Sequence, residues 1–228
     1  MNYRLIVFDV DGTLCESRKE IDKEMIELLN DLSLRTGIAL FSGADYDRIQ
    51  TQAANKLRFK PFIGEYSAAK IYLDTQVISD NYFNMEEIKQ IQRAFAEITE
   101  HPRSLLSIDA HQVTYYLVNP DVATEKERNT ADPTKLIRKK IIKRISPFLE
   151  DFNIRIGGKT SIDITLKEVS KKNGVDKLKD YLNLRDGDIL FVGDRCFKGG
   201  NDYMEEVYNS KQVAGPEDTK RIIRGLLK

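Results

Sequence analysis

Short apolar runs alternate with amphipathic stretches in the first third of this chain of 228 residues. Leu5–Phe8 is long enough for one buried strand, and Ile38–Phe41 has the same character. Between them, apolar residues recur at the spacing of one helix face over Lys23–Leu34. Pro61–Ile63 and Ala69–Leu73 predict further short strands. Such alternation is typical of a parallel sheet covered by helices on both faces.

The pattern changes near Asp80. Apolar residues spaced three and four apart predict a helix over Ile88–Ile98 and another over Lys135–Phe148. The polar segment Pro120–Pro133 has no periodicity and is predicted to be a loop. Two strand pairs are also predicted, namely Ser104–Ile108 with Val113–Val118, and Ile154–Ile156 with Ser161–Leu166. This arrangement indicates an α+β module.

The strand–helix alternation then resumes with a predicted helix over Val175–Leu182 and a buried strand over Ile189–Val192. Glu217–Leu227 is predicted to be the last helix, started by Pro216. The chain is therefore predicted to be an α/β protein with a Rossmann-like parallel-sheet core. The core takes residues 1–80 and 167–228, and the inserted module takes residues 81–166.

Charge and composition narrow the classes of partner. Lys and Arg together number 36, as do Asp and Glu, so the net charge is zero and gives no overall attraction to nucleic acid or membranes. The basic residues of Lys135–Phe148 are interpreted as the solvated face of a helix. The N-terminal apolar run is too short for a signal peptide, and two cysteines, Cys15 and Cys196, make no disulfide framework. We therefore expect a cytoplasmic protein.

Two carboxylates, Asp9 and Asp11, follow the first predicted strand directly, and Gly12 and Thr13 form a turn after them. The carboxyl ends of strands are where open α/β sheets bind ligands. Two acids so close repel each other unless a cation lies between them, and Mg²⁺ suits carboxylate ligands. A calcium loop would need further ligands that the next residues do not supply.

Three more polar residues stand at corresponding places. Ser42 ends the second predicted strand, Asp194 ends a later one, and Lys171 begins a helix. Neighbouring parallel strands would bring these groups into one crevice, where carboxylates bind a metal ion while a hydroxyl and an ammonium bind phosphate. An aspartate can attack phosphorus, so one of these aspartates is the candidate nucleophile. With Asp9 in that role, Asp11 is placed to act as general acid and base. Ser42 as a helix cap and Lys171 as a solvated lysine are the alternatives.

These residues resemble the four motifs of the haloacid dehalogenase superfamily of phosphotransferases, with the matches Asp9-Val10-Asp11-Gly12-Thr13, Ser42, Lys171 and Gly193-Asp194…Asn201-Asp202. The resemblance implies that Asp9 is the nucleophile and that Ser42 and Lys171 bind phosphate. It also implies that Mg²⁺ is held by Asp9, the Asp11 carbonyl and Asp194, with Asp202 nearby. The inserted module resembles the type IIB α/β cap, which closes over the core site and selects the substrate.

Within that superfamily, Gly193–Asp202, Ala214–Ile222 and Ile156–Asp163 are similar to eukaryotic-type phosphomannomutases. This resemblance implies that Ser161 and Asp163 bind a sugar phosphate from the cap. It also implies that two copies pair through their caps. The apolar side of the Lys135–Phe148 helix either serves that contact or packs on the sheet of the module.

The chain departs from the mutases where they hold a second phosphate with arginines. Ile108–Asp121 contains no arginine, which leaves Arg103, Arg155 and Lys159 as substitutes. Without a second phosphate site, a phospho-aspartate loses its phosphoryl group to water more easily. We therefore expect a Mg²⁺-dependent phosphatase acting on a phosphorylated sugar or similar small metabolite. The alternatives are a phosphomannomutase that interconverts hexose 1- and 6-phosphates and a catalytically silent binding protein, against which the intact motif set argues.

Overall fold

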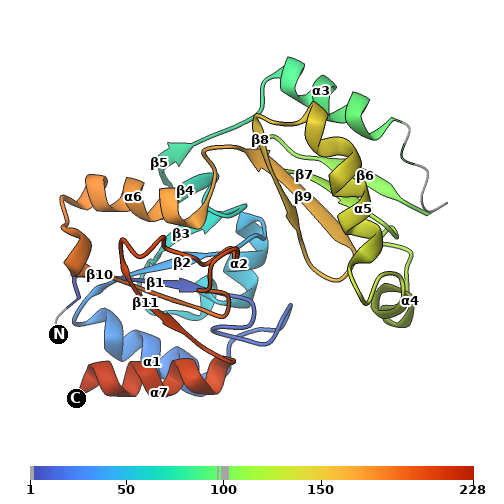
Figure 1. Ribbon diagram of the computed structural model, residues 1–228. Coiled ribbons are helices and arrows are strands. Elements are labelled where there is room, and N and C mark those ends of the chain that lie inside the picture. Colours follow the sequence, from blue (N-terminus) through green and yellow to red (C-terminus); the bar gives the residue numbers. More distant parts are fainter. Residues whose placement is uncertain (1–2, 97, 99–102) are drawn as a thin grey trace. The chain divides into compact units, whose positions relative to one another are not determined.

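The computed structural model describes residues 3–96, 98 and 103–228, and the chain divides into two compact units. The first unit joins Met1–Asp80 to Val169–Lys228, and the second unit is Asn81–Glu168. Figure 1 shows the chain coloured from its N-terminus to its C-terminus. Among the described residues, no helix is long and apolar enough to cross a lipid bilayer.

The first unit is built on a seven-stranded sheet in the order β11-β10-β1-β2-β3-β4-β5. β1 (Leu5–Asp9) lies between β10 (Ile189–Gly193) and β2 (Gly37–Phe41), parallel to both. β3 (Phe62–Glu65) and β11 (Asn209–Gln212) extend the parallel part on either side. All parallel strands therefore present their carboxyl ends at one edge of the sheet.

Two strands at one edge of the sheet are antiparallel, a detail that the sequence prediction did not contain. β4 (Lys70–Leu73) and β5 (Gln76–Asp80) are antiparallel to their neighbours. Only residues 66–69 connect β3 to β4, and a parallel connection needs a crossover of a dozen or more residues. The predicted class is confirmed: an α/β core, mostly parallel, with a separate antiparallel insert.

Helices cover both faces of the parallel strands. Ile6 and Phe8 of β1 pack on one face against α1 (Lys23–Ser33) and α7 (Pro216–Leu227), where Met25, Leu29 and Ile223 are buried. Leu5 and Val7 face the other side, toward Val175 and Leu178 of α6 (Lys171–Leu182). Figure 1 shows α1 beside α7 on one face of the sheet and α6 on the other. This two-sided burial explains why β1, β2 and β10 read as continuous apolar runs.

Shorter elements complete the first unit. α2 (Tyr46–Gln52) follows β2 and buries Ile49. Single turns of 3₁₀ helix follow at Ala54–Lys56 and Asp186–Asp188. Asp45 caps the start of α2, since its side chain accepts a hydrogen bond of 2.8 Å from the Arg48 amide.

The second unit has a four-stranded antiparallel sheet in the order β6-β7-β9-β8. Its strands are β6 (Leu105–Ile108), β7 (Val113–Tyr116), β8 (Phe152–Ile156) and β9 (Ser161–Leu166). α3 (Met85–Phe95) packs on the sheet through Phe95, which stacks on Tyr115 with ring centroids 4.9 Å apart. α5 (Leu136–Ile145) buries Ile141 and Ile145, and a 3₁₀ turn, Ser146–Phe148, continues it.

The segment Pro120–Pro133, predicted to be a loop, contains the helix α4 (Glu125–Thr130). The loop prediction is wrong there because α4 has no buried residue and therefore no apolar periodicity. Its stability comes from a capping box: Thr124 accepts from the Glu127 amide, and the Glu127 carboxylate accepts from the Thr124 amide at 2.7 Å.

Candidate active site

Three carboxylates meet at the carboxyl edge of the core sheet. Asp9, Asp194 and Asp202 each place an oxygen within 4.8 Å of the others. Asp9 ends β1 and Asp194 directly follows β10, so the parallel pairing of these strands brings them together. Asp202 comes from the loop after β10, and both Asp9 and Asp202 are buried. This carboxylate cluster (Asp9, Asp194, Asp202) is a candidate metal centre.

Lys171, the first residue of α6, lies inside the carboxylate cluster. Its ammonium donates to Asp9 Oδ1 and, at 2.7 Å, to Asp202 Oδ1, and its side chain is 0% exposed. Ser170 fixes the start of α6 by accepting from the Asn173 amide at 3.1 Å. The neighbouring Lys172 instead pairs with Asp176 along the helix at 2.9 Å. The structure therefore places Lys171, and not Lys172, at the cluster.

The carboxylate cluster carries more negative charge than Lys171 balances, which favours binding of a cation. Burial raises the pKa of Asp9 to about 7, against the opposing effect of the Lys171 ammonium. Burial, followed by the nearby Asp202 carboxylate, also raises the pKa of Asp194. Burial alone would lower the pKa of Lys171, but Asp202 and Asp9 raise it overall, so Lys171 stays charged. Arg195, half exposed, adds a longer contact of 3.7 Å to Asp194.

A further observation fits a metal ion at this place. Asn201, next to Asp202, has a buried side-chain oxygen without a hydrogen-bond partner among the described residues. Oxygen ligands and excess negative charge are what Mg²⁺ or another hard divalent cation prefers. The residues present therefore fit such an ion.

The turn after β1 shapes the site through Gly12 and Thr13. Gly12 has φ +86°, and a Cβ there would lie 2.9 Å from Asp194 Oδ2, so only glycine suits both the backbone and the space. Thr13 donates from Oγ1 to Asp9 Oδ2 at 2.8 Å and accepts from Thr219 Oγ1 at 2.7 Å through its carbonyl. The sequence assigns Thr13 to a turn and to the first motif, and the structure adds that its hydroxyl orients Asp9.

Ser42 is buried directly after β2, whose Phe41 pairs with Asp9 in the sheet register. Its Oγ accepts from the Ala44 amide at 3.1 Å, and Asp45, not Ser42, caps α2. Ser42 is thus at the same sheet edge as Asp9, and its role as a phosphate ligand stays a prediction.

Asp11 does not belong to the carboxylate cluster. Its carboxylate instead accepts hydrogen bonds from Arg48 and Gln52 of α2 and from the Arg18 amide. Nothing in the spacing of Arg48 and Gln52 reveals that α2 lies beside the turn that follows β1.

The residues predicted to bind substrate from the cap, Ser161, Asp163 and Arg103, all belong to the second unit. Ser161 and Asp163 lie on β9, and a Cβ at Gly157 would approach Ser161 Oγ and Asp163 Oδ2 to 2.2 Å. Burial raises the pKa of Asp163 to about 6. Arg103 donates to Glu127 of α4 at 2.8 Å. The roles of these residues in substrate binding stay predictions.

Arg138 corrects the interpretation that all basic residues of α5 lie on a solvated face. It is buried, pairs with Asp132 at 2.9 Å and donates to the Gly158 carbonyl at 2.8 Å. A buried carboxylate partner and carbonyl acceptors are what make a buried guanidinium tolerable. Arg138 therefore fixes the turn between β8 and β9.

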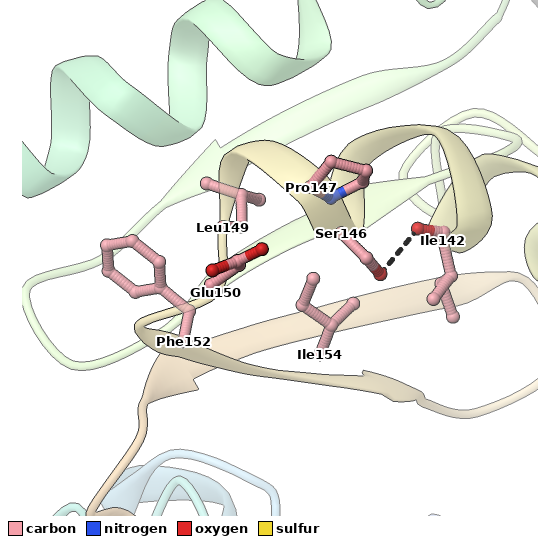
Figure 2. A pocket seen from close by; sticks show the side chains of 7 residues that line it. All are labelled: Ile142, Ser146, Pro147, Leu149, Glu150, Phe152 and Ile154. Carbon is pink, nitrogen blue, oxygen red and sulfur yellow. Dashed lines mark hydrogen bonds between the residues drawn. The ribbon is translucent and has the colours of Figure 1, made fainter.

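A surface depression of about 530 Å³ on the second unit carries no comparable chemistry. Figure 2 shows its mostly apolar side chains, with Ser146 donating to the Ile142 carbonyl at 2.7 Å. Its lining residues are Ile142, Ser146, Pro147, Leu149, Glu150, Phe152 and Ile154. A single carboxylate without a partner base or cation does not make an active site, so the carboxylate cluster remains the candidate.

Residues 6–203 match the family of haloacid dehalogenase-like hydrolases. The chain belongs to this family. The matched range contains the carboxylate cluster, Lys171 and Ser42. The predicted superfamily is confirmed, and the protein is a hydrolase of that superfamily.

The relatives of this hydrolase by sequence include phosphomannomutases. The chain is 25% identical to the one from Dendrobium officinale, over 94% of this chain and 90% of the relative. It is 26% identical to the one from Spinacia oleracea, over 95% of this chain and 93% of the relative. The predicted likeness to phosphomannomutases is therefore confirmed as a distant one over nearly the full length.

Solved structures show the same fold at lower identity. An IMP-nucleotidase of Plasmodium falciparum superposes with a TM-score of 0.72 at 14% identity, covering 99% of this chain and 68% of the other. A haloacid dehalogenase-like hydrolase from Bacteroides thetaiotaomicron gives a TM-score of 0.67 at 14% identity, covering 98% and 99%. These likenesses concern the fold and not the substrate.

Proposed function

We propose that this hydrolase is a Mg²⁺-dependent phosphatase that releases phosphate from a phosphorylated sugar or similar small metabolite. The observation that carries the proposal is the carboxylate cluster with Lys171 at the carboxyl edge of the sheet. Asp9 is held there by Thr13 at one oxygen and by Lys171 at the other. A nucleophile fixed at both oxygens, in a buried and charged site, suits phosphoryl transfer, which needs positioning more than covalent chemistry.

In the proposed reaction an oxygen of Asp9 attacks phosphorus, and the bond to the leaving oxygen of the substrate breaks. Asp11 gives a proton to that leaving oxygen and then takes one from the water that hydrolyses the phospho-aspartate. Ser42 and Lys171 bind the remaining phosphate oxygens and balance their charge. Both steps use residues of the first unit.

Asp9, Asp194 and the Asp11 carbonyl would hold Mg²⁺, with Asp202 beside it. The bound ion would supply positive charge that the phosphate and the cluster share. We expect chelation to remove activity and Mg²⁺ to restore it.

The substrate class rests on the phosphomannomutase relatives and on Ser161 and Asp163, which we propose contact the sugar phosphate. The same relatives favour the second candidate, a hexose-phosphate mutase. Against it, two of the three cations named as substitutes for the cap arginines of the mutases are already paired: Arg103 with Glu127 at 2.8 Å and Lys159 with Glu125 at 3.3 Å. This pairing supports the phosphatase.

The first prediction concerns Asp9→Asn, which removes the nucleophile. We expect phosphate release from sugar phosphates in the presence of Mg²⁺ to fall by at least about 10³-fold, while circular dichroism shows an unchanged fold. Asp31→Asn, at an exposed position of α1, is the matched control and should keep full activity. Phosphate release by Asp9→Asn at the normal rate would contradict the assignment of the nucleophile.

The same assay separates the two candidate functions. Phosphate release that does not respond to glucose 1,6-bisphosphate would support the phosphatase. Interconversion of hexose 1- and 6-phosphates that starts only when the bisphosphate is added would establish the mutase instead.

We also propose a cytoplasmic location, and pairing of two copies through the second unit remains a prediction. α5 buries Ile141 and Ile145 in its own unit, whereas Leu136 and Phe148 are exposed. Light scattering coupled to size exclusion measures the oligomeric state.

A further inference from the structure

The carboxylate of Asp11 is bound by three neighbours. Arg48 Nη2 donates to both of its oxygens, at 3.2 Å to Oδ1 and 3.1 Å to Oδ2. Gln52 Nε2 donates to Oδ1 at 3.1 Å, and the Arg18 amide donates to the same oxygen at 2.6 Å. Four hydrogen bonds to one carboxylate, two of them from a guanidinium, leave it little rotational freedom.

Arg48 and Gln52 form one rigid support, since they lie one helical turn apart on the same face of α2. Arg48 Nε donates to Gln52 Oε1 at 3.2 Å, which fixes the plane of the guanidinium. The Gln52 side chain also donates to the Lys19 carbonyl at 3.0 Å, and the Gln52 backbone carbonyl accepts from the Ile21 amide at 2.9 Å. α2 is thereby joined to the segment that follows Asp11.

We propose that Arg48, braced by Gln52, is a positioning residue that sets where the Asp11 carboxylate stands during phosphoryl transfer. The inference rests on the proposed function, in which Asp11 is the general acid and base. Asp11 keeps 25% of its side chain exposed and Arg48 keeps 33%, so packing alone does not fix either side chain. General acid catalysis requires the acid within hydrogen-bonding distance of the leaving oxygen. In this proposal, the contacts of Arg48 with both Asp11 oxygens supply the restraint that keeps the carboxylate there.

A plain surface ion pair is the competing explanation for the Arg48–Asp11 contact. Such a pair contributes little to stability and has no connection with the leaving group of a substrate. A positioning residue, by contrast, affects how well Asp11 can protonate the leaving group of the substrate. A sugar alkoxide is a poor leaving group and needs a proton from Asp11, whereas 4-nitrophenolate leaves without one.

The experiment compares Arg48→Met with Arg58→Met on a sugar phosphate and on 4-nitrophenyl phosphate. Arg58 pairs with Glu27 at 3.0 Å on the surface of the same unit and is the matched control. The value of kcat/KM reports the steps up to phosphoryl transfer to Asp9. For Arg48→Met we expect it to fall about 10- to 100-fold with the sugar phosphate and less than about threefold with 4-nitrophenyl phosphate. Arg58→Met should change neither.

Two further variants sharpen the result. In an Asp11→Asn background, Arg48→Met should cause no further loss on the sugar phosphate, because the group that it positions is already removed. Arg48→Lys keeps the charge but not the paired contact, so it should restore part of the activity.

An equal loss on both substrates, or a full additional loss in the Asp11→Asn background, would overturn the positioning role. A crystal structure of Arg48→Met in which the Asp11 carboxylate keeps its place would overturn it even without an activity measurement. Failure of the proposed function is a separate result: the unaltered protein would then release no phosphate, or Asp9→Asn would stay active.

Discussion

Lys171 balances the negative charge of two buried carboxylates at this site. Its ammonium lies between the carboxylates of Asp9 and Asp202, and all three groups are buried. The arrangement is tolerable because each charge has a partner, and removing one partner leaves an uncompensated charge in a poorly solvated place. The side chain that balances the buried carboxylates is therefore also the one that binds phosphate in the proposed reaction.

We predict that Lys171→Met lowers the free energy of unfolding by about 3–5 kcal/mol in the absence of a divalent cation. Lys172→Met removes only the partly exposed pair with Asp176 and should cost less than about 1 kcal/mol. Urea denaturation followed by circular dichroism measures both variants. Equal, small losses in the two variants would show that Lys171 does not balance the cluster.

Asp163 gives a pH dependence whose sign follows from its environment. Burial raises its pKa from 3.8 to about 6 in the folded chain, so the folded state binds the proton more tightly than the unfolded state does. Its contribution to stability is therefore fully present below pH 3.8 and is lost as the pH rises through about 6. The loss amounts to about 3 kcal/mol, at 1.36 kcal/mol per pKa unit.

We predict that Asp163→Asn removes this loss, so that the variant gains stability relative to the unaltered protein between pH 4 and pH 7. Urea midpoints measured across that range give the difference directly. For Asp151→Asn, at an exposed position of the same unit, the difference in urea midpoint from the unaltered protein should stay constant across that pH range. A constant difference between Asp163→Asn and the unaltered protein at every pH would contradict the raised pKa.

At the scale of elements, the sequence predicts those helices and strands that bury an apolar face. β1, β2 and β10 are buried on both faces, so their apolar runs identified them, and α1 has one buried face with the expected spacing. The polar residues that follow β1 and β10 were therefore placed at one sheet edge, where the structure has Asp9 and Asp194. This reasoning works because parallel pairing fixes where strand ends meet.

Elements without a buried face escaped prediction. α4 owes its helix to the capping box of Thr124 and Glu127, and β11 is polar and exposed along its length. The backbone of β11 pairs with β10, and side-chain patterning carries no signal of that pairing. Arg48 escaped for a different reason: its contact with Asp11 joins residues far apart in the sequence, and only the folded chain brings α2 to that turn.

At the scale of the whole molecule, the two units differ in how the chain builds them. The second unit is one continuous segment that contains all four strands of its sheet, with Ile91, Phe95, Ile141 and Ile145 buried. The first unit needs two segments, because β1 lies between β2 from the first segment and β10 from the last.

We predict that residues 81–168 fold when produced alone and that residues 1–80 do not. The isolated second unit should give the circular dichroism of an α+β protein and one cooperative urea transition. Residues 1–80 lack β10, which leaves one edge of β1 unpaired, and should show no such transition. An isolated second unit without cooperative unfolding would contradict the independence of that unit.

The position of β1 in the middle of its sheet has a consequence for biosynthesis. The ribosome synthesises β1 before the second unit and β10 only after the whole second unit. Until then the nascent chain carries an open strand edge, the kind of surface on which chains aggregate. The candidate site around Asp9 is likewise incomplete until Lys171, Asp194 and Asp202 have been translated, which happens after the second unit. In the growing chain, β1 thus gains its missing partner strand and the candidate site gains its remaining charged residues at the same stage, after the second unit has been synthesised.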